Sequence, residues 1–495
     1  MRRGSERSPA PPSLYPLPRY HAEPFSQSRS FPVYTPPVND HPIAQHILAN
    51  LDRHLADGES LHRAYINPGF AKLLGMGGFG RRFVSASGCT MTDDTGRSYL
   101  DCVAGYGVMN LGHNHPGVRS ALHAILDRGL PSFSQVECAP MAGLAAERLC
   151  AALPGDLRRV FFSNSGSEAV DSAVKLARAA TGKKRLLACT GGYHGNMLGV
   201  LGLTDNPSRR DAHRPLLPGI NHIPYGDLTS LREALKWKDV AALVVEPVQG
   251  EGGVIVPPTD YLIAAKEECH RHGALLVVDE VQTGLGRTGA LFAIEHSGVL
   301  PDILACAKAL GGGLVPVGAT VATTKVFEKA YGSLRTCLDH RSTFGGGPLA
   351  MAAILATLEI LERENLVPAA RSTGAYAKEK FQALAVKHDR IEDVRGAGLM
   401  LGIKLRPPVL PGLSKLAKMA TTLYAQYMAI RLISDHGIIT QVAANDLTVL
   451  KIMPPLMVDR PSIDRLTSAL DTVIGDKGTL GAVVDLAKGA LAKTD

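Results

Sequence analysis

The pattern of apolar and polar positions in this 495-residue chain changes at about residue 40. Residues 1–40 are rich in proline and serine and show no apolar periodicity, so we expect a flexible tail or an arm laid over a partner subunit. From residue 41 the apolar positions recur at helical spacing, which predicts an amphipathic helix over residues 41–58. The residues on its apolar face are Ile43, Ile47, Leu48, Leu51 and Leu55.

The middle of the chain alternates short apolar runs with helical patterns. Nearly continuous apolar runs are typical of strands in a parallel sheet that is covered on both faces. Helical patterns over 167–181 and 259–273 separate these runs, which predicts a doubly wound α/β domain with a mostly parallel sheet. The predicted strands are 158–164, 184–190, 241–247, 274–280 and 302–308.

The two ends of the globular part have a different pattern. Residues 83–104 predict two strands around a turn at Asp93–Gly96, and residues 348–364 predict a long helix. We therefore expect a smaller α+β domain that both chain ends build. The predicted divisions are a tail (1–40), the first part of the small domain (41–100), the large domain (101–345), the second part of the small domain (346–475) and a second tail (476–495).

Composition narrows the classes of function. Lys and Arg number 53 against 46 Asp and Glu, and the tail carries part of the net charge of +7, so no nucleic-acid surface is expected. No apolar run reaches the roughly 18 residues that a membrane span needs, so no membrane association is expected. The eight cysteines form no C-x-x-C pair, so neither a zinc knuckle nor a redox pair is indicated. Several, such as Cys189 and Cys306, lie in apolar segments, which favours buried, reduced thiols and a cytoplasmic protein.

Two motifs suggest ligands that their context does not favour. Residues 75–80 match G-x-G-x-x-G, but a dinucleotide fingerprint follows a strand and opens a helix. Here the motif follows a helix-like segment, so a flexible turn is the better interpretation. His113 and His115 are spaced loosely like metal ligands, but a turn is again favoured, and we predict no metal site.

A third motif is a candidate phosphate site. Residues 163–168, with the sequence SNSGSE, follow one predicted strand and open a predicted helix. Ser165 and Glu168 fit the capping box S-x-x-E. Small residues around Gly166 leave the first backbone N–H groups of the helix open to an anion, most simply a phosphate. An ordinary helix cap would have the same sequence, so the motif alone leaves both interpretations open.

Asp279 and Lys308 each lie at the end of a predicted buried strand. A carboxylate there lies where open α/β sheets bind ligands, and a cationic ligand atom would compensate its burial. A lysine among apolar residues loses its proton more easily and becomes a nucleophile, which suits a Schiff base with an aldehyde. The alternatives are a solvated strand end for Asp279 and a lysine that reaches the surface for Lys308.

One ligand satisfies all three sites. Pyridoxal 5′-phosphate (PLP) carries a phosphate, an aldehyde and a ring nitrogen that must stay protonated. Asp279 would keep that nitrogen charged, so that the ring can accept electrons from a substrate carbon. We therefore predict PLP as the cofactor.

Eight motifs occur in order along the chain, and three of them contain Ser165, Asp279 and Lys308. They are LDCVAGYGVMNLGHNHP (100–116), SNSGSEAVDSAVKLAR (163–178), GGYHG (191–195), VEPVQGEGG (245–253), VVDEVQTGLGRTG (277–289), AKALGGG (307–313), STFGGGPLA (342–350) and VRGAGLMLGIKL (394–405). With these motifs the chain resembles, from about residue 70 to 475, the class III aminotransferases of the fold-type-I PLP enzymes. Within the class it is most similar to the ornithine, acetylornithine and putrescine aminotransferases.

The resemblance implies which residues hold the cofactor. Lys308 and Asp279 would be the catalytic residues, with Lys308 as the Schiff-base lysine and Asp279 paired with the ring nitrogen. Tyr193 would stack on the ring with His194 beside it, and Gln282 would bind the ring hydroxyl. The full implied set is Ser165, Gly166, Ser167, Tyr193, His194, Asp279, Val281, Gln282, Lys308 and Thr343.

The resemblance also implies a homodimer, in which Thr343 reaches the phosphate of the neighbouring subunit's cofactor. Tyr106 would contact substrate. Glu251 would hold Arg395 while an amine substrate is bound and release it for the carboxylate of a 2-oxo acid. Asn196 departs from the ornithine-type pattern, where an Arg binds a substrate carboxylate. A neutral amide cannot make that bidentate contact, which favours a diamine donor or an aldehyde substrate.

The predicted activity is therefore transamination by a ping-pong mechanism. A terminal amino group of a diamine or diamino acid would move to or from a 2-oxo acid such as 2-oxoglutarate or pyruvate. Once the donor displaces it, Lys308 would act as general base. The alternatives are another class III reaction (aminomutase, decarboxylase or phospho-lyase), amination of an aldehyde in a secondary pathway, and a non-catalytic scaffold. The presence of Lys308, Asp279 and Gln282 argues against a scaffold.

Overall fold

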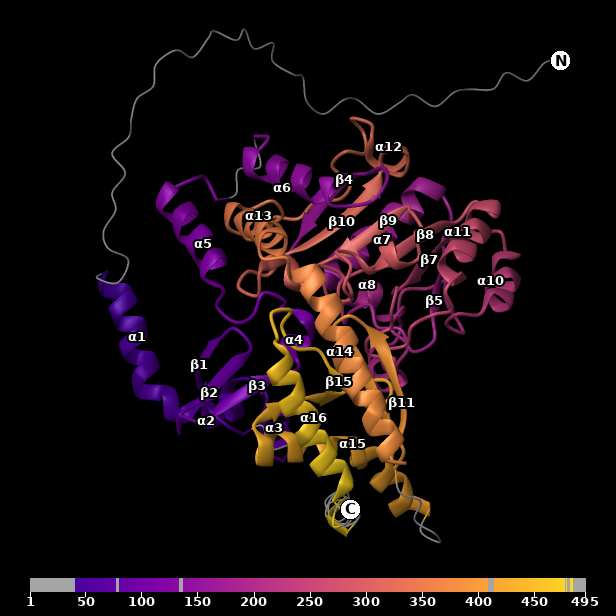
Figure 1. Cartoon of the computed structure of the whole chain (residues 1–495). Coiled ribbons are helices and arrows are strands. Elements are labelled where there is room, and N and C mark those ends of the chain that lie inside the picture. Colours follow the sequence, from indigo (N-terminus) through magenta and orange to yellow (C-terminus); the bar gives the residue numbers. More distant parts are fainter. Residues whose placement is uncertain are drawn as a thin grey trace, which may run out of the picture.

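A central sheet organises the molecule (Figure 1). The computed structural model describes residues 41–76, 80–132, 137–407, 414–476, 478 and 481–483. Within them this sheet has seven strands in the order β4-β10-β9-β8-β7-β5-β6, which confirms the predicted α/β class. The strands are β4 (Leu157–Ser163), β5 (Arg185–Cys189), β6 (Ile220–Ile223), β7 (Val240–Val245), β8 (Leu275–Asp279), β9 (Ile303–Cys306) and β10 (Gly318–Thr323).

The sheet is mostly parallel, as the apolar runs predict. Strands β9, β8, β7, β5 and β6 pair parallel to one another. Strand β10 lies between β9 and β4 and runs antiparallel to both of them. Every residue of β7 and of β9 is buried. The short segments that form β6 and β10, INHI and GATVAT, carry weaker apolar patterns, and the sequence does not predict them.

Alternate residues of the central strands enter two hydrophobic cores, one on each face of the sheet. Val244 of β7 belongs to the core that includes α7 (Gly166–Thr181), whereas Val245 belongs to the core that includes α11 (Tyr261–Arg271). Burial on both faces explains why these strands carry so few polar side chains before their carboxyl ends. The polar residues that follow the strands are therefore concentrated at one edge of the sheet.

A second sheet joins the two ends of the chain. In the described residues it has four strands in the order β1-β2-β3-β13. The predicted turn at Asp93–Gly96 connects β2 to β3, but the segment holds three strands rather than two, because a further turn at Gly88 separates β1 from β2. Strand β13 comes from the far end of the sequence and pairs parallel with β3. The bounds are β1 (Phe83–Ser87), β2 (Thr90–Asp93), β3 (Ser98–Asp101) and β13 (Ile438–Ile439).

A third sheet lies in the C-terminal part, with the described order β11-β12-β15-β14. The predicted long helix is confirmed as α13 (Pro348–Arg363), and α14 (Leu366–Lys387) packs on β11. The α+β character of this part is as expected, while the exact domain boundaries stay a prediction. The strands are β11 (Ile391–Ala397), β12 (Met400–Leu405), β14 (Gln441–Val442) and β15 (Val449–Ile452), and the remaining long helices are α15 (Ser414–His436) and α16 (Arg460–Gly475).

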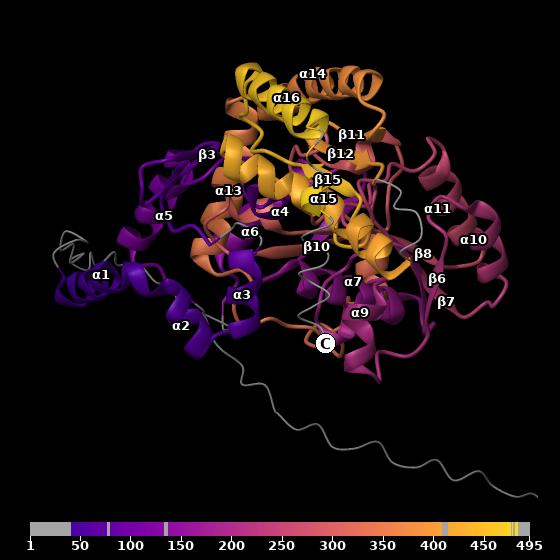
Figure 2. The same cartoon turned by 90° about the horizontal axis from the view of Figure 1, so that it is seen from below.

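The first described helices lie at the margin of the molecule (Figure 1, Figure 2). The predicted helix is confirmed as α1 (Pro42–His54), followed by a short 3-10 turn and α2 (Gly58–Tyr65). Its apolar residues are exposed in this chain, with Ile43 64% and Ile47 60% exposed. The two predicted tails lie largely outside the described residues. None of the helices that the structure describes has the length and hydropathy of a bilayer-spanning segment.

Candidate active site

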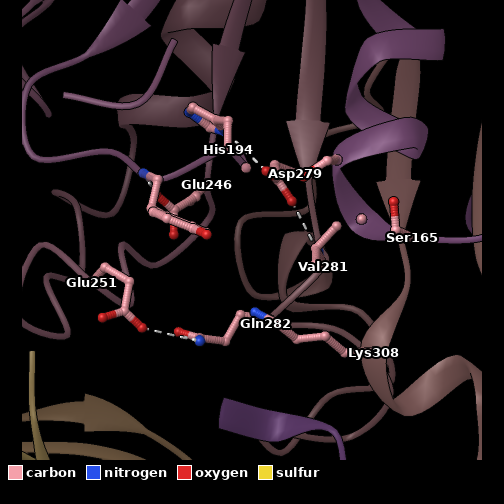
Figure 3. Close-up of a pocket in the computed structure, with 12 residues that line it drawn as sticks. Ser165, His194, Glu246, Glu251, Asp279, Val281, Gln282 and Lys308 are labelled. Atoms are coloured by element: carbon pink, nitrogen blue, oxygen red, sulfur yellow. Dashed lines mark hydrogen bonds and ion pairs between the residues drawn. The ribbon is translucent and has the colours of Figure 1, made fainter. Parts of the chain in front are cut away.

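A pocket opens where the central strands end (Figure 3). It encloses about 160 Å³, and its walls come from the segments that follow β5, β7, β8 and β9 and from the start of α7. This is the edge where open α/β sheets bind ligands. The lining residues are Ser165, Gly166, Ser167, Tyr193, His194, Gly195, Glu246, Glu251, Asp279, Val281, Gln282 and Lys308.

Asp279 is the last residue of β8 and is almost fully buried. Its Oδ2 accepts a hydrogen bond from His194 Nδ1 at 2.8 Å, and its Oδ1 accepts one from the backbone N–H of Val281 at 3.0 Å. Burial disfavours the charged imidazole, but the bond to Asp279 and the charges of Asp279 and Glu246 outweigh it, so the pKa of His194 lies above its usual value. Asp279 is thus held in one orientation.

The start of α7 is open to an anion. Ser165 is the N-cap residue, and its side chain accepts a hydrogen bond from the backbone N–H of Glu168 at 3.2 Å, as the capping box predicts. The second half of the box differs, because the Glu168 carboxylate accepts from the backbone and side chain of Asn164 instead of from Ser165. The backbone N–H groups around Gly166 and Ser167 therefore face the pocket at the positive end of the helix.

Lys308 lies beyond the strand on which the sequence places it. Strand β9 ends at Cys306, and Lys308 begins a short 3-10 helix with a left-handed backbone, φ +49°. Such a conformation costs a non-glycine residue of order 1–3 kcal/mol and is concentrated at functional sites. Burial lowers the pKa of Lys308, against the opposing charges of Glu251 and Asp279. The amine therefore loses its proton more readily than an exposed lysine.

The pocket residues fit the cofactor that the sequence predicts. Gln282 is 8% exposed, and its Oε1 has no hydrogen-bond partner among the described residues, so a polar group is free to meet a ligand. A Cβ on Gly166 would lie 2.7 Å from Val281 Cγ1, which means that only glycine leaves this wall open. An anion site, a buried carboxylate and a reactive lysine thus surround one cavity, as PLP requires.

Glu251 has a partner that the sequence does not predict. The resemblance pairs it with Arg395, but in the structure its carboxylate is bound by the ammonium of Lys451 and by the backbone N–H of Ala444 at 3.0 Å. Lys451 is 3% exposed. Burial raises the pKa of Glu251, but Lys451 outweighs this effect, so the pKa of Glu251 lies below its usual value. In the structure without substrate Glu251 is thus paired with Lys451, and its pairing with Arg395 when an amine is bound stays a prediction.

The sheet register explains the exchange. Arg395 of β11 and Lys451 of β15 are both cross-strand partners of Gly402, on opposite sides of β12. Lys451 is the one of the two that bonds to Glu251. Arg395 Nε donates to Gly253 O at 2.8 Å, and its guanidinium lies 3.8 Å from Asp446 and 3.5 Å from Asp393.

The remaining predicted site residues lie in and around the pocket. Tyr193 lines the pocket, and the guanidinium of Arg209 lies 5.6 Å from the centre of its ring. Asn196 is exposed. Tyr106 has a left-handed backbone, φ +62°, and its carbonyl accepts a hydrogen bond from Gln282 at 3.2 Å. Thr343 is exposed in a loop and does not line the pocket of its own chain.

Two further pocket residues, Glu246 and Gly195, are not predicted as site residues from the sequence. Glu246 follows β7 and is 5% exposed, and Gly195 lies against Ser167 so closely that a side chain there would clash. The rule that selected Asp279, a carboxylate directly after a buried strand, applies equally to Glu246.

The two histidines of the other motif have partners within the protein. His113 Nε2 pairs with Asp101 at 2.8 Å, and His115 caps the helix that begins at Pro116. No cluster of metal-ligating side chains occurs among the described residues. The glycine-rich motif begins in the last two residues of the helix Pro68–Met76, and the predicted turn falls on residues 77–79, which lie outside the described part.

Comparison with known proteins identifies the family. The model of the class III aminotransferases matches residues 79–474, which is most of the chain. The chain belongs to the class III aminotransferases. Its cofactor is accordingly PLP, its fold is that of the fold-type-I PLP enzymes, and its reaction is transamination.

Two curated relatives narrow the comparison. A putrescine aminotransferase of Pectobacterium atrosepticum is 42% identical over 436 residues, which cover 85% of this chain and 89% of the relative. The aminotransferase PigE of a Serratia species is 38% identical over 453 residues, which cover 84% of this chain. This chain spans about half of PigE, since only 53% of that protein is matched.

The solved structures agree with this family. The ornithine aminotransferase from Toxoplasma gondii, crystallised with partial occupancy of PLP in its active site, is 30% identical with a TM-score of 0.70. The match covers 82% of this chain and 91% of that one.

Proposed function

We propose that this chain transfers the terminal amino group of a diamine to a 2-oxo acid such as 2-oxoglutarate or pyruvate. The observation that carries the proposal is the Glu251 carboxylate in the pocket wall, close enough to Lys308 to influence its charge. A carboxylate at this place in the wall favours a substrate that carries a second cationic group. The neutral Asn196 and the 42% identity to a putrescine aminotransferase support the same donor class.

The residues of the pocket would hold the cofactor at three places. The backbone at the start of α7 would bind the phosphate, Asp279 would keep a proton on the ring nitrogen, and Gln282 would bind the ring hydroxyl. His194 would hold Asp279 in place, as it does in the geometry described above. The residues proposed to contact the cofactor are Ser165, Gly166, Ser167, Tyr193, His194, Asp279, Val281, Gln282 and Lys308, together with Thr343 of a neighbouring subunit.

When bound, PLP supplies an aldehyde that takes up the amino group and a ring that accepts electrons from the substrate carbon. Lys308 would hold the aldehyde until the donor amine displaces it. The freed amine of Lys308 would then take a proton from the donor carbon and return it to the cofactor side. Because burial lowers the pKa of Lys308, more of this amine is unprotonated at neutral pH than in an exposed lysine. The same groups act in reverse order with the 2-oxo acid.

Glu251 and Lys451 would bind the two substrates in turn. Glu251 would receive the distal ammonium of the diamine, and Lys451 would receive the carboxylate of the acceptor acid. Lys451 Nζ lies 5.4 Å from the ring centre of Tyr106, so both residues are placed beside the same substrate end. Lys451 thereby takes the role that the resemblance suggested for Arg395.

The active unit is proposed to be a homodimer. Thr343 lies beside an apolar cavity of about 620 Å³ that Leu126, Phe344 and Leu349 help to line. Phe344 is 57% exposed, and exposed apolar patches of this kind are typical of subunit interfaces. Mixing Lys308→Ala chains with Thr343→Ala chains tests this, because each mixed dimer would contain one intact site and regain activity. Absence of recovery in verified mixed dimers would contradict a shared site.

We also assign the chain to the cytoplasm. All eight cysteines are free and five of them are buried, which is typical of a reducing compartment.

A panel of amine donors tests the proposed substrate class. Diamines should bleach the absorbance of the bound cofactor at lower concentration than ornithine or α-amino acids, and 2-oxoglutarate or pyruvate should restore it. The Lys308→Ala variant should not respond, whereas a change of the exposed Lys236 to Ala should leave the response as in the wild type. Bleaching by α-amino acids but not by diamines would contradict the proposal.

A further inference from the structure

Glu246 is a buried pocket residue to which neither the motifs nor the steps above give a role. It is the first residue after β7, and the pairing of Val245 with Val278 places it next to Asp279 at the same edge of the sheet. Its side chain is 5% exposed and lines the pocket. A carboxylate so deeply buried is costly unless its oxygens are satisfied.

Both carboxylate oxygens of Glu246 are satisfied by backbone groups of two different loops. Oε1 accepts a hydrogen bond from the N–H of Tyr193 at 2.9 Å, and Oε2 accepts one from the N–H of Gly250 at 3.1 Å. The first loop carries the ring of Tyr193 and the imidazole of His194, and the second carries Glu251. One side chain therefore fixes the two loops relative to each other.

Glu246 also belongs to the charge network of the pocket. Burial raises the pKa of Glu246 to about 7, with His194 opposing and Asp279 adding to the effect. Its negative charge helps to raise the pKa of His194, and it opposes the effect of burial, which lowers the pKa of Lys308. Its backbone carbonyl accepts a hydrogen bond from the hydroxyl of Tyr225 at 2.8 Å, which anchors the residue from the opposite side.

We propose that Glu246 is a positioning residue for the cofactor ring: its carboxylate holds Tyr193 in place over the pocket and supplies a negative charge to the pair of His194 and Asp279. The inference rests on the proposed assignment of this pocket to PLP. A carboxylate that only stabilised the fold would make the same two hydrogen bonds. The test must therefore distinguish an effect on the position of Tyr193, an effect of the negative charge and an effect on the stability of the fold.

Two substitutions separate position from charge. Glu246→Gln keeps the length of the side chain but loses the charge and one acceptor oxygen, so one backbone N–H loses its partner. Glu246→Asp keeps the charge but cannot reach both loops. The matched control is Glu280→Gln, because Glu280 is also buried, adjoins Asp279, and has a pKa raised to about 7 by burial, yet it does not line the pocket. Its carboxylate binds Thr283 and the backbone N–H of Ile294.

The readouts are the affinity of the apoenzyme for PLP, the pH midpoint of the bound cofactor's absorbance change, and the thermal midpoint. Both Glu246 variants should bind PLP about tenfold more weakly, the loss expected for one hydrogen bond to a charged group. Glu246→Gln alone should shift the absorbance midpoint to lower pH, by about 0.5 unit, because removing an anion makes nearby cations lose their protons more easily. Glu280→Gln should lower only the thermal midpoint.

Two results would overturn the inference. One is a Glu246→Gln enzyme with the wild-type affinity and midpoint, and the other is an equal shift in Glu280→Gln. If the wild type itself took up no PLP, the proposed function would fail instead, so the two failures are distinguishable.

Discussion

The ammonium of Lys451 is bonded to the carboxylate of Glu251 inside the pocket wall, although 200 residues separate them in the sequence. The two side chains are only 3% and 10% exposed. Removing one partner of such a buried pair leaves an uncompensated charge, whereas removing both does not. The pair can therefore be tested through its single and double variants.

Lys451→Met should raise the KM for the 2-oxo acid about tenfold or more, because the carboxylate of the acceptor loses its charge-assisted partner. The half-reaction with the amine donor should keep its rate within about threefold, and stopped-flow absorbance measures each half-reaction separately. Glu251→Gln should weaken the binding of the diamine and should affect the half-reaction with the amine donor more than the half-reaction with the 2-oxo acid. If Lys451→Met impaired both half-reactions equally, the assignment to the acceptor would be wrong.

Asp279→Asn should slow proton removal from the donor by roughly 100-fold or more, because a neutral amide cannot stabilise a protonated ring nitrogen. The cofactor should largely stay bound, since the phosphate site at the start of α7 and Lys308 are unchanged. Single-turnover absorbance measures the step, and a donor deuterated at the reacting carbon shows whether proton removal limits it. An unchanged rate with a full isotope effect would contradict the role of Asp279.

Gly250→Ala should weaken PLP binding, because a Cβ at this position would overlap the side-chain oxygen of Gln282. Gln282 would have to move away from the ring hydroxyl that it is proposed to bind, and we expect about a tenfold loss of affinity. Titration of the apoenzyme measures it. Gly143→Ala is the control, because it lies in a helix with no atom within 4 Å of the added Cβ and should leave binding unchanged.

The free energy of unfolding should fall as the pH rises from about 5 to about 7. Burial in the fold raises the pKa of Glu280 from 4.5 to about 7. The folded state therefore binds the proton more tightly than the unfolded state over this pH range. The contribution of Glu280 to the free energy of unfolding is full below pH 4.5 and is lost as the pH rises towards about 7. Glu246 contributes in the same direction.

Glu280→Gln should therefore flatten this pH dependence in part. Denaturant unfolding of the apoenzyme at several pH values between 5 and 8 measures the slope for both proteins. A slope that is identical in the variant and the wild type would show that Glu280 does not titrate in this range.

The sequence predicts the parallel strands well because burial on both faces leaves a local signature in each of them. It also places Ser165, Asp279 and Lys308 at one edge, since the carboxyl ends of parallel strands meet there. The register of the small sheet has no such signature. Arg395 and Lys451 are both cations on short strands that pair with Gly402 of β12, and only the three-dimensional structure shows that Lys451 is the one bonded to Glu251.

Local geometry accounts for the other differences. The left-handed backbone of Lys308 ends the strand two residues earlier than the apolar run suggests, because the chain must turn to bring the amine into the pocket. The exposed apolar face of α1 is a case in which periodicity predicts the helix correctly but says nothing about what covers it.

The pairing of β3 with β13 has a consequence for biosynthesis. Ile438 and Ile439 emerge from the ribosome more than 300 residues after Leu100 and Asp101, with which they pair. Strands β1, β2 and β3 therefore have no partner along the free edge of β3 while the strands of the central sheet are translated. A nascent chain released before residue 438 cannot close this sheet, so the first strands acquire their last neighbour only after residues 438 and 439 have been translated.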